Sequence, residues 1–579
     1  MCCGNSILQK GLPFFYLHKI FYTLFKAIEI VNSQNIFLFL FVNKVTINSA
    51  RALLFQWKNQ RTIKQKKESW GKKVKTSGLK KLVIGAASLL LLSACGSNGA
   101  TKDSETAKSS ASSSETEVAS GASEQEYTDP SELKDQYDIV IVGAGGAGMA
   151  AALSAKEAGM NPVILEKMPI AGGNTLKSSG GMNASETKFQ KEQGIEDSNQ
   201  QFFDDTLKGG KGTNDQELLH YLVDNSASAI DWLDGMGITL DNISYSGGAS
   251  VKRIHRPHDG SAVGTYLVDG LLRNIHEKEI PLFVNADVKK INEKDGKVTG
   301  VSVKIGDEEK TINGNAVVVT TGGFGSNKEM IEKYRPDLKG YVSTTSEGST
   351  GDGIKMIESL GGATVDMDQI QVHPTVVQDT GMLVSETVRG EGAILVNQQG
   401  ERFYNELETR DNVSAAITAL PESYAYLIFD DALAGRAKQV DFYKEQGVVV
   451  EADTIEALAK KIDMDADTLA KTLDTWNQSV KDKKDEAFGR ETAMDYDLTT
   501  GPYYAIKIAP GIHHTMGGVK INTNTQVLKK DGSVIDGLYA AGEVTGGIHG
   551  QNRIGGNAVA DIMVFGRQAG VQASEYAKK

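Results

Sequence analysis

The sequence predicts an α/β fold in which a parallel-sheet domain is interrupted by an inserted α+β domain. Three observations support this prediction. The apolar run Tyr137–Val142 precedes a glycine cluster, which an alanine-rich helical stretch and a second apolar run, Pro162–Leu165, then follow. A third apolar run ends in a glycine turn at Gly322. A fourth ends at Gly542, so the first domain is completed only near the end of the chain.

The first unit has the order of strand, glycine turn, helix, strand and acidic residue that is typical of a Rossmann-like, dinucleotide-binding domain. Gly143, Gly145 and Gly148 allow a tight turn and a close approach of the backbone to a pyrophosphate at the helix N-terminus. Glu166 follows the second strand, where a carboxylate accepts hydrogen bonds from ribose hydroxyls. The alternative, a glycine-rich loop without a ligand, fits the surrounding strands and helix less well.

Further segments favour FAD over NAD as the dinucleotide. The small residues around Asn174 and Gly180 let the backbone lie against an isoalloxazine ring. A helix that begins at Asn557 directs its N-terminus at the N1/C2=O edge of the flavin, where it stabilises negative charge. Each glycine cluster taken alone is equally well explained as a structural turn, but together, in this order, they indicate a flavin site.

The predicted FAD-binding domain is discontinuous and comprises residues 134–368 and 505–579. Residues 369–504 form the inserted capping domain. Apolar residues recur at helical spacing in this insert, at Ile455, Leu458, Ile462, Leu469, Leu473 and Trp476. We interpret this pattern as core packing.

The N-terminal part of the chain has the features of an export signal. Two lysines precede the apolar run Leu82–Leu92, which is short for a membrane span, and Leu-Ser-Ala-Cys95 follows. This segment resembles a bacterial lipobox. We therefore expect residues 74–95 to be a lipoprotein signal peptide, with Cys95 lipidated at the outer face of the cell membrane. A buried helix that ends in cysteine is the alternative.

The segments on either side of this signal lack the pattern of a folded domain. Residues 96–133 are rich in Ser, Ala and Glu and predict a disordered tether, because they cannot bury enough apolar surface to offset the entropy of ordering. Residues 1–73 are a doubtful extension, since a signal sequence that starts so far along a chain is unusual. We expect translation to start near Val74 or Leu79.

Composition excludes several classes of function. The formal net charge is -12, with a basic stretch over the first 81 residues and an acidic remainder. An acidic body repels a phosphate backbone, so nucleic acid is a poor partner. The cysteines are Cys2, Cys3 and Cys95. The folded body therefore has no disulfide, cysteine zinc site or haem-attachment motif, and its redox centre must be an organic cofactor.

Several motifs between residue 137 and the C-terminus carry a family resemblance. They are Gln371-Val-His373-Pro374-Thr375, Ser385-Glu386-Thr-Val-Arg389-Gly390, Asn405-Glu-Leu-Glu-Thr-Arg410-Asp411, His513-His514-Thr515-Met516-Gly517-Gly518 and Gly546-Gly-Ile-His549-Gly-Gln-Asn552-Arg553. With them the chain resembles soluble fumarate reductases of the flavocytochrome c type, within the succinate dehydrogenase/fumarate reductase flavoprotein family. The resemblance implies reduction of a C=C bond conjugated to a carboxylate, by a hydride from flavin N5 and a proton from the protein.

The resemblance also implies residue roles. Arg410 is the proton donor, and Glu386 with Arg389 is the relay that re-protonates it, because arginine alone is a weak acid. A helix-capping ion pair of Arg410 with Asp411 is the alternative. The substrate-binding residues are His373, Ser385, His513, Arg553 and Gly181.

The resemblance assigns a larger set of residues to cofactors. The FAD-binding residues are Gly143, Gly145, Ala147, Gly148, Glu166, Asn174, Thr175, Ser179, Gly180, Val288, Asp352, His514, Glu543, Ala558 and Val559. A monovalent cation is implied at Thr515, Met516, Gly517, Glu543 and Thr545. No histidine lies near Gly172 and Gly173, where membrane-bound relatives attach FAD, so the FAD is expected to be non-covalent.

Two positions bear on the substrate. Ser246 stands where the fumarate reducers of this group have methionine, which weakens the case for fumarate, whereas Ser385 keeps a hydroxyl that suits a short dicarboxylate.

We predict a fumarate reductase, with a urocanate or aryl-acrylate reductase as the alternative. A dehydrogenase or oxidase of steroids or amino acids and a non-catalytic electron-relay lipoprotein are the other readings. The electron donor is external: reduced flavin, a flavinylated protein or a cytochrome.

Overall fold

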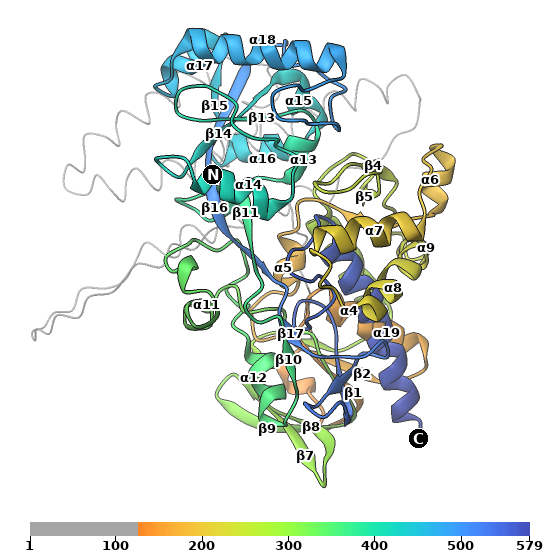
Figure 1. Cartoon of the computed structure of the whole chain (residues 1–579). Coiled ribbons are helices and arrows are strands. Elements are labelled where there is room, and N and C mark those ends of the chain that lie inside the picture. Colours follow the sequence, from red (N-terminus) through yellow and green to blue (C-terminus); the bar gives the residue numbers. More distant parts are fainter. Residues whose placement is uncertain (1–125) are drawn as a thin grey trace, which may run out of the picture. The chain divides into compact units, whose positions relative to one another are not determined.

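The computed structural model describes residues 126–579 (Figure 1). The predicted extension, the signal peptide with Cys95 and most of the tether lie outside the described residues. The larger of the sheets runs in the order β18-β19-β8-β9-β1-β2-β6, with β7 paired to β8. Its strands are β1 (Gln136–Val142), β2 (Pro162–Leu165), β6 (Leu282–Phe283), β7 (Ala286–Lys294), β8 (Lys297–Ile305), β9 (Glu308–Val319), β18 (Gln526–Leu528) and β19 (Val534–Ala540).

The centre of this sheet is parallel, as the sequence predicts for a dinucleotide-binding fold. Strand β1 pairs in parallel with β2 and with β9, and β9 pairs in parallel with β19. The three apolar runs around Tyr137, Val317 and Leu538 are therefore neighbours, although they come from distant parts of the sequence. The predicted α/β fold class with an inserted second domain is confirmed.

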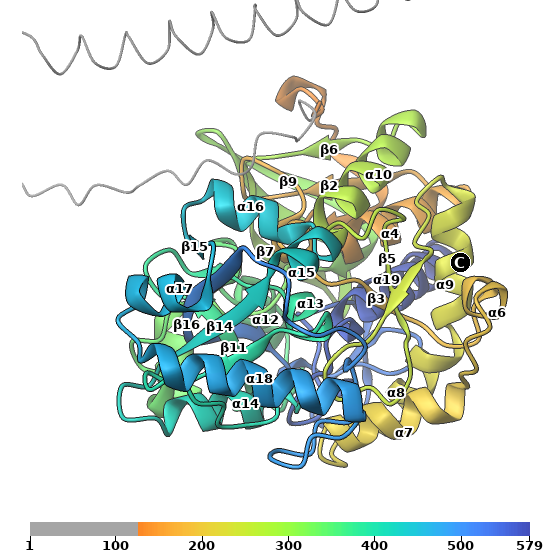
Figure 2. The same ribbon diagram turned by 90° about the horizontal axis from the view of Figure 1, so that it is seen from above.

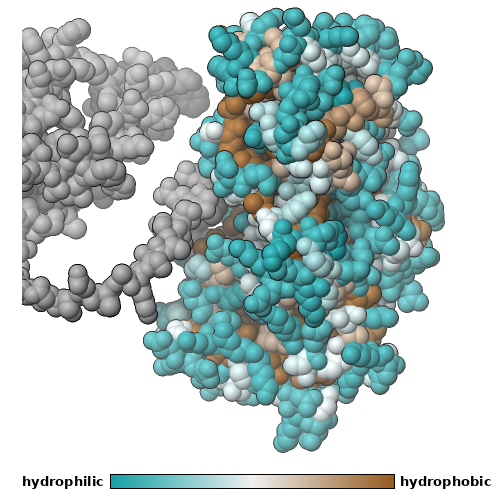
Figure 3. Space-filling view, turned by 60° about the vertical axis from the view of Figure 1, so that its left-hand side comes forward, coloured by the Kyte–Doolittle hydropathy of each residue, from teal (hydrophilic) through white to brown (hydrophobic). Residues whose placement is uncertain are grey.

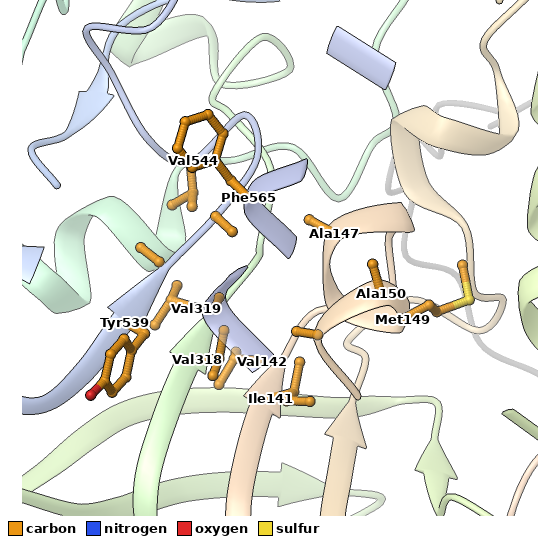
Figure 4. Close-up of a cluster of buried hydrophobic side chains, with 14 of the residues drawn as sticks. Ile141, Val142, Ala147, Met149, Ala150, Val318, Val319, Tyr539, Val544 and Phe565 are labelled. Atoms are coloured by element: carbon orange, nitrogen blue, oxygen red, sulfur yellow. The ribbon is translucent and has the colours of Figure 1, made fainter. Parts of the chain in front are cut away.

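The helix after the glycine turn packs against the last helix of the chain. These are α4 (Gly146–Glu157) and α19 (Asn557–Ala577). A Cβ atom at Gly566 would lie 2.7 Å from the carbonyl oxygen of Ala147, and one at Gly570 would lie 2.3 Å from that of Ala151. Glycine at these positions therefore permits a close approach of the two backbones. Figure 4 shows Phe565, Val544 and Ala147 in one cluster of buried hydrophobic side chains. The two ends of the domain are fixed together at this contact.

Shorter elements surround this sheet. They are η1 (Pro130–Glu132), α5 (Gly173–Leu176), β3 (Met182–Asn183), α6 (Lys188–Glu192), α7 (Asn199–Gly209), α8 (Gln216–Asp224), α9 (Ser226–Gly235), β4 (Asn242–Ser244), β5 (Ile254–Arg256), α10 (Val263–Glu277), α11 (Lys328–Tyr334), η2 (Pro336–Leu338), α12 (Asp352–Ser359), β10 (Thr364–Val365) and β17 (Gly518–Val519).

A second hydrophobic core belongs to a sheet of order β12-β11-β16-β14-β13, with β15 paired to β16. Its elements are β11 (Ile370–Val377), β12 (Met382–Leu383), α13 (Glu386–Gly390), β13 (Ile394–Val396), α14 (Arg410–Thr418), β14 (Ala425–Asp430), α15 (Asp431–Arg436), α16 (Gln439–Glu445), β15 (Val450–Ala452), α17 (Ile455–Lys461), α18 (Ala466–Asp482) and β16 (Tyr503–Thr515). Figure 2 shows α18 beside this sheet.

The long strand β16 belongs to both cores. Ile506 and Ile508 pack in the second core, whereas Ile512 packs in the first. Strand β11, which pairs antiparallel with β16, likewise contributes Ile370 to the first core and Val377 to the second. These paired strands therefore connect the two cores.

The helical pattern predicted in the insert forms two helices. Helix α17 ends at Lys461, Asp463 has φ 54, and the Asp465 carboxylate caps α18 by accepting from Thr468 N–H. Leu458, Leu469, Leu473 and Trp476 are fully buried, which confirms that the pattern is core packing.

The predicted tether ends earlier than expected. Thr128 N–H donates to the Leu282 carbonyl at 3.0 Å, and Leu282 N–H donates to Thr128 Oγ1 at 3.0 Å, so this residue is bonded to β6. The short helix η1 follows at Pro130–Glu132. The tether boundary at residue 133 is therefore wrong, because residues from about 127 onward bond to the folded domain.

The face shown in Figure 3 is mostly hydrophilic, with separate apolar patches. The large hydrophobic side chains exposed in the described part of the chain are Ile170, Tyr266, Tyr496 and Val571. Between residues 126 and 579, no helix combines the length and the apolar character needed to cross a bilayer.

Candidate active site

The glycine turn before α4 contains glycines with different roles. Gly143 has φ +105, and a Cβ atom there would lie 2.6 Å from the Thr320 carbonyl oxygen. A Cβ atom at Gly148 would lie 2.0 Å from the Gly143 carbonyl oxygen. At Gly145, by contrast, the nearest protein atom would be 3.9 Å away. Packing explains the first two glycines, whereas Gly145 faces open space that can hold a ligand.

The N-terminus of α4 has free donors beside this space. Gly146 N–H donates to Thr175 Oγ1 at 3.0 Å. The amides of Ala147 and Gly148 donate to no residue in the described part of the chain. Unpaired amides at the positive end of a helix are suited to a phosphate group.

Glu166 is held at the end of β2. Its Oε2 accepts from Ala144 N–H and its Oε1 from Met168 N–H, both at 2.8 Å. Burial raises the pKa of this carboxyl, and the two backbone donors oppose the rise. Each oxygen keeps a further lone pair for a ribose hydroxyl.

Two other residues predicted to contact FAD, Val288 and Asp352, belong to segments that are hydrogen-bonded to Glu166 or to its neighbour Lys167. Ala286 N–H donates to the Glu166 carbonyl, which places β7 and Val288 beside it, although the Val288 side chain packs in the core. Asp352 begins α12, where its carboxylate accepts from Lys167 Nζ at 2.6 Å.

Glu543 connects two predicted flavin-side segments. Its Oε2 accepts from Asn174 Nδ2 at 2.7 Å, and its Oε1 accepts from Thr515 N–H at 3.0 Å. His514 Nδ1 lies 3.5 Å from the same Oε1. Burial raises the pKa of Glu543 against these hydrogen bonds.

The N-terminus of α19 is open. Its N-cap, Gly556, has φ 89 and carries no capping side chain. Asn183 Nδ2 instead holds Asn557 Oδ1 and the Gly555 carbonyl, each at 2.7 Å. The amides of Ala558 and Val559 have no acceptor among residues 126–579. This helix end and that of α4 together fit a dinucleotide with a charged pyrophosphate and an electron-rich ring.

The small-residue segment between these helix ends is partly fixed by packing. The Ser179 carbonyl accepts from Ser385 Oγ and from Gln439 Nε2, both at 3.4 Å. A Cβ atom at Gly181 would lie 2.3 Å from the His255 carbonyl oxygen, so packing alone requires glycine there. Gly180 lies between these two positions, and no other residue contacts it closely: a Cβ atom there would be 3.4 Å from Ile254.

Arg410 and Glu386 form a buried ion pair. Arg410 is the first residue of α14, and its Nε and Nη2 donate to Glu386 Oε2 at 2.9 and 2.7 Å. Glu386 Oε1 accepts from Gly247 N–H at 2.7 Å. Burial alone would raise the pKa of Glu386, but the positive charges of Arg410 and Arg389 outweigh it and lower the pKa. Asp411 pairs with Lys211 at 2.6 Å, and Arg410 pairs with Glu386. The alternative of a helix-capping ion pair between Arg410 and Asp411 is therefore wrong.

Gln371 is a site residue that the sequence reasoning missed. Its Oε1 accepts from Arg410 Nη1 at 3.1 Å and from Arg553 Nη2 at 3.0 Å. Its Nε2 donates to Asn552 Oδ1 at 2.8 Å and to the Arg553 carbonyl at 2.7 Å. One amide oxygen thus holds two guanidinium groups together. The only signal in the sequence was its position at the start of the first motif.

Two histidines face each other in the same cluster. The ring centroids of His373 and His513 are 5.0 Å apart in an edge-to-face arrangement. Loss of hydration, followed by the charge of Arg410, lowers the pKa of both well below the ordinary value, so both are neutral at pH 7. His373 Nε2 is buried without a hydrogen-bond partner in the described chain.

The cluster carries unbalanced positive charge. Arg410 and Arg553 share Gln371, and Glu386 compensates Arg410. Burial, and then the charge of Arg410, lowers the pKa of Arg553, whose Nε has no partner among the described residues. A buried cation with a free donor binds an anionic group favourably. The arrangement can therefore hold a carboxylate.

The predicted relay has a gap in the structure. Arg389 is fully buried, and its Nη1 donates to the Glu406 carbonyl. Its Nε and Nη2 have no partner in residues 126–579, and no hydrogen bond joins it to Glu386. Burial lowers the pKa of Arg389, although the charge of Glu386 opposes this.

Ser385 has a structural role besides its predicted one. Its Oγ accepts from Thr387 N–H at 3.2 Å as the N-cap of α13, and its own N–H donates to the Tyr443 hydroxyl at 2.8 Å. The serine thus fixes the start of the short helix that carries Glu386 and Arg389.

The residues predicted for a cation lie together near the end of β16. Met516 N–H donates to the Gln369 carbonyl at 2.9 Å, Thr545 Oγ1 donates to the Gly542 carbonyl at 2.8 Å, and Gly517 lies against the Asp366 backbone. The described chain has no group of three or more His, Cys, Asp or Glu that could hold a metal. The cation site at Thr515, Met516, Gly517, Glu543 and Thr545, held partly by backbone, stays a prediction.

Known proteins are similar to this chain in sequence and in fold. The model of a family described as FAD binding domain matches residues 138–559. The fumarate reductase (cytochrome) of Shewanella frigidimarina is 44% identical over 465 residues, which cover 80% of this chain and 81% of that protein. The chain belongs to the FAD-binding domain family. It is a FAD-dependent flavoprotein of the fumarate reductase type, and FAD is its cofactor.

Other relatives of this flavoprotein carry different names. An NADH:fumarate oxidoreductase of Klebsiella pneumoniae (strain 342) is 50% identical over 483 residues, or 83% of this chain, and the match spans only 52% of that relative. A urocanate reductase of Eggerthella lenta is 37% identical, covering 77% of this chain and 76% of that protein. The solved open conformation of a flavocytochrome c3 fumarate reductase has a TM-score of 0.65 and 45% identity over 78% of this chain and 80% of its own.

The free space at Gly145 makes a prediction about FAD. We expect Gly145→Ala to leave the thermal unfolding temperature of the apoprotein unchanged, because the new methyl group meets no protein atom within 3.9 Å. It should weaken FAD binding at least about tenfold by occupying the ligand's space, as measured by fluorescence titration. Gly435→Ala, at an exposed position of helix α15, is the control. Unchanged FAD affinity would contradict the assignment.

The bridge at Gln371 makes a second prediction. We expect Gln371→Glu to weaken binding of succinate about 10–100-fold at pH 7, because a new negative charge would neutralise the guanidinium pair. FAD content should not change. The measurement is a succinate titration of the oxidised flavin spectrum, with Gln478→Glu on α18 as a charge-matched control. Equal affinity in variant and wild type would show that the pair does not bind carboxylates.

Proposed function

We propose that this flavoprotein reduces the C=C bond of a small unsaturated carboxylate, with fumarate as the substrate and succinate as the product. The observation that carries the proposal is the buried pair of Arg410 and Arg553 on one amide oxygen of Gln371. Free donors on Arg553 Nε and His373 Nε2 accompany it. The names of the relatives from Shewanella frigidimarina and Klebsiella pneumoniae support the same substrate class.

The residues of the cluster would divide the work between binding and proton transfer. Arg553, His373 and His513 bind the carboxylate ends, since they are donors with no anionic partner of their own. Binding fixes the alkene and stabilises the charge that develops on its carboxylate. When bound beside these residues, FAD would supply the hydride that the alkene needs.

Arg410 would donate the proton to the neighbouring alkene carbon. Its guanidinium is held by Glu386 and Gln371, so one orientation is fixed before substrate arrives. Glu386, which is a carboxylate, would accept a proton that arrives from the side of Arg389 and pass it to Arg410. The gap between Glu386 and the unpaired donors of Arg389 requires a bridging water in this relay, because no direct hydrogen bond connects them.

A urocanate or aryl-acrylate reductase remains the alternative with a structural argument. Ser246 is buried with its Oγ unpaired in the described chain, and its neighbour Gly247 donates to Glu386. An unpaired hydroxyl can form a hydrogen bond with a polar ring in the substrate, whereas an apolar side chain at this position could not. Steady-state assays with reduced viologen and fumarate, urocanate or cinnamate decide between them. Turnover of none of the three would refute the reductase proposal.

The proposal also includes the cellular location of the enzyme and its electron donor. The lipobox at Cys95 supports a protein anchored by lipid to the outer face of a bacterial cell membrane. Its electrons would come from an external donor: reduced flavin, a flavinylated protein or a cytochrome. A cytochrome is the donor suggested by the names of the Shewanella frigidimarina relatives.

Arg410→Ala tests the chemical role of the guanidinium. We expect turnover of fumarate to fall at least about a thousandfold, since a general acid contributes about 10²–10⁴. FAD content should be retained. Arg335→Ala, which removes a partly exposed arginine paired with Asp337, is the control. Electron transfer at an unchanged rate, without alkene reduction by either form, would favour the electron-relay alternative.

Cys95→Ser tests the anchor. We expect the wild-type chain to partition with membranes after expression in a bacterium and to incorporate a labelled fatty acid. The serine variant should do neither, because the lipidated thiol is missing. Fatty-acid labelling and membrane fractionation are the measurements. A soluble, unlabelled wild-type chain would refute the anchor without affecting the reductase proposal.

A further inference from the structure

The two neutral histidines of the cluster must each place a single proton on one of two ring nitrogens. A neutral imidazole has one donor and one acceptor nitrogen, and the partner of one nitrogen determines the state of the other. The choice matters here, because a carboxylate ligand accepts hydrogen bonds and is repelled by a lone pair. The hydrogen bonds on the far nitrogens, Nδ1 of His373 and His513, therefore decide what the site can bind.

Backbone geometry fixes this choice at His373. Thr375 N–H donates to His373 Nδ1 at 3.3 Å. An amide can only donate, so Nδ1 is unprotonated and Nε2 carries the proton. Thr375 Oγ1 lies 3.2 Å from the same Nδ1, but its proton goes to the Val384 carbonyl at 2.8 Å. His373 thus presents an unpaired N–H donor.

At His513 the group beside Nδ1 is a side-chain hydroxyl, and it favours the same tautomer. Thr344 Oγ1 lies 2.7 Å from His513 Nδ1 and 3.3 Å from the Ile512 carbonyl oxygen. The Ile512 carbonyl already accepts from Thr344 N–H at 2.9 Å. A hydroxyl has one proton, and the short contact to a nitrogen that has no other donor is the favourable place for it.

We propose that Thr344 is a positioning residue that holds His513 in the tautomer with its proton on Nε2, so that this nitrogen donates to a bound carboxylate. The proposal rests on the proposed function, because it takes a carboxylate as the ligand. With the opposite tautomer, the Nε2 lone pair would face the carboxylate oxygen. His373 and His513 then act as a matched pair of neutral donors beside Arg553.

The hydroxyl of Thr344 is held rigidly enough for this role. Ser343 forms a β-bridge with Ile512, and Ile512 N–H donates to the Val342 carbonyl at 2.8 Å. The segment is therefore held beside β16 by an isolated bridge, one residue away from His513. Thr344 itself is 8% exposed, so water does not compete freely for its hydroxyl.

The tautomer can be observed directly in the wild-type protein. In ¹⁵N-histidine spectra of the oxidised, FAD-loaded protein, His513 Nδ1 should resonate as an unprotonated nitrogen and Nε2 as a protonated one. The His513→Gln variant assigns the signals. Protonated Nδ1 in the wild type would overturn the proposal, whatever any variant does.

Three variants test the consequence for binding. Thr344→Val keeps the shape and removes the hydroxyl, so we expect the Kd for succinate to rise about tenfold, the effect of one hydrogen bond to a charged group. Thr344→Ser restores the hydroxyl and should bind within about twofold of the wild type. Thr472→Val removes a hydroxyl that donates to the Gly400 carbonyl in the second core and should bind as the wild type does.

The outcomes separate this proposal from the function on which it rests. If the wild type binds none of succinate, fumarate and urocanate, the proposed function fails. If the wild type binds succinate and Thr344→Val binds it equally well, the function stands and the role of Thr344 is refuted. A Thr344→Ser variant as weak as the valine variant would also refute it, because packing rather than the hydroxyl would then be responsible.

Discussion

The structure of the site depends on keeping two guanidinium groups side by side in a buried place. Arg410 and Arg553 would repel each other, and both lose hydration on burial. The Gln371 amide oxygen offers a dipole to each, and Glu386 supplies one negative charge. Among these three side chains one positive charge has no carboxylate partner, and burial, followed by the charge of Arg410, lowers the pKa of Arg553. The group is therefore suited to an anionic ligand.

The strands that connect the two cores also carry residues of this site. Gln371 and His373 lie on β11, and His513 lies on β16, the two strands that take part in both cores. Arg410 and Glu386 start short helices of the second core region, whereas Arg553 comes from the loop before α19. Rigid paired strands thus hold the histidines, and helix ends aim the charged groups at them.

Local patterns in the sequence predicted the fold well, and the site only in part. The strands around Tyr137 and Pro162 and the helix from Asn557 are correct, because apolar runs and glycine turns are short-range signals. The break at Asp463 was missed, since a left-handed aspartate leaves no periodic signal. Gln371 was missed because a neutral amide has no titratable chemistry. Its role exists only when Arg410 and Arg553, distant in sequence, are brought to the same oxygen.

The segment that carries Thr344 also reaches the cofactor side of the site. Ser346 N–H donates to Asn174 Oδ1 at 2.6 Å, and Asn174 Nδ2 donates to Glu543, which in turn accepts from Thr515 N–H. Thr344 and Thr515 lie on either side of His513 in this circuit. A shift of Asn174 on loss of FAD would therefore displace the hydroxyl that orients His513. Because these hydrogen bonds and the short backbone segments between them form one closed circuit, the geometry at His513 is coupled to the cofactor side.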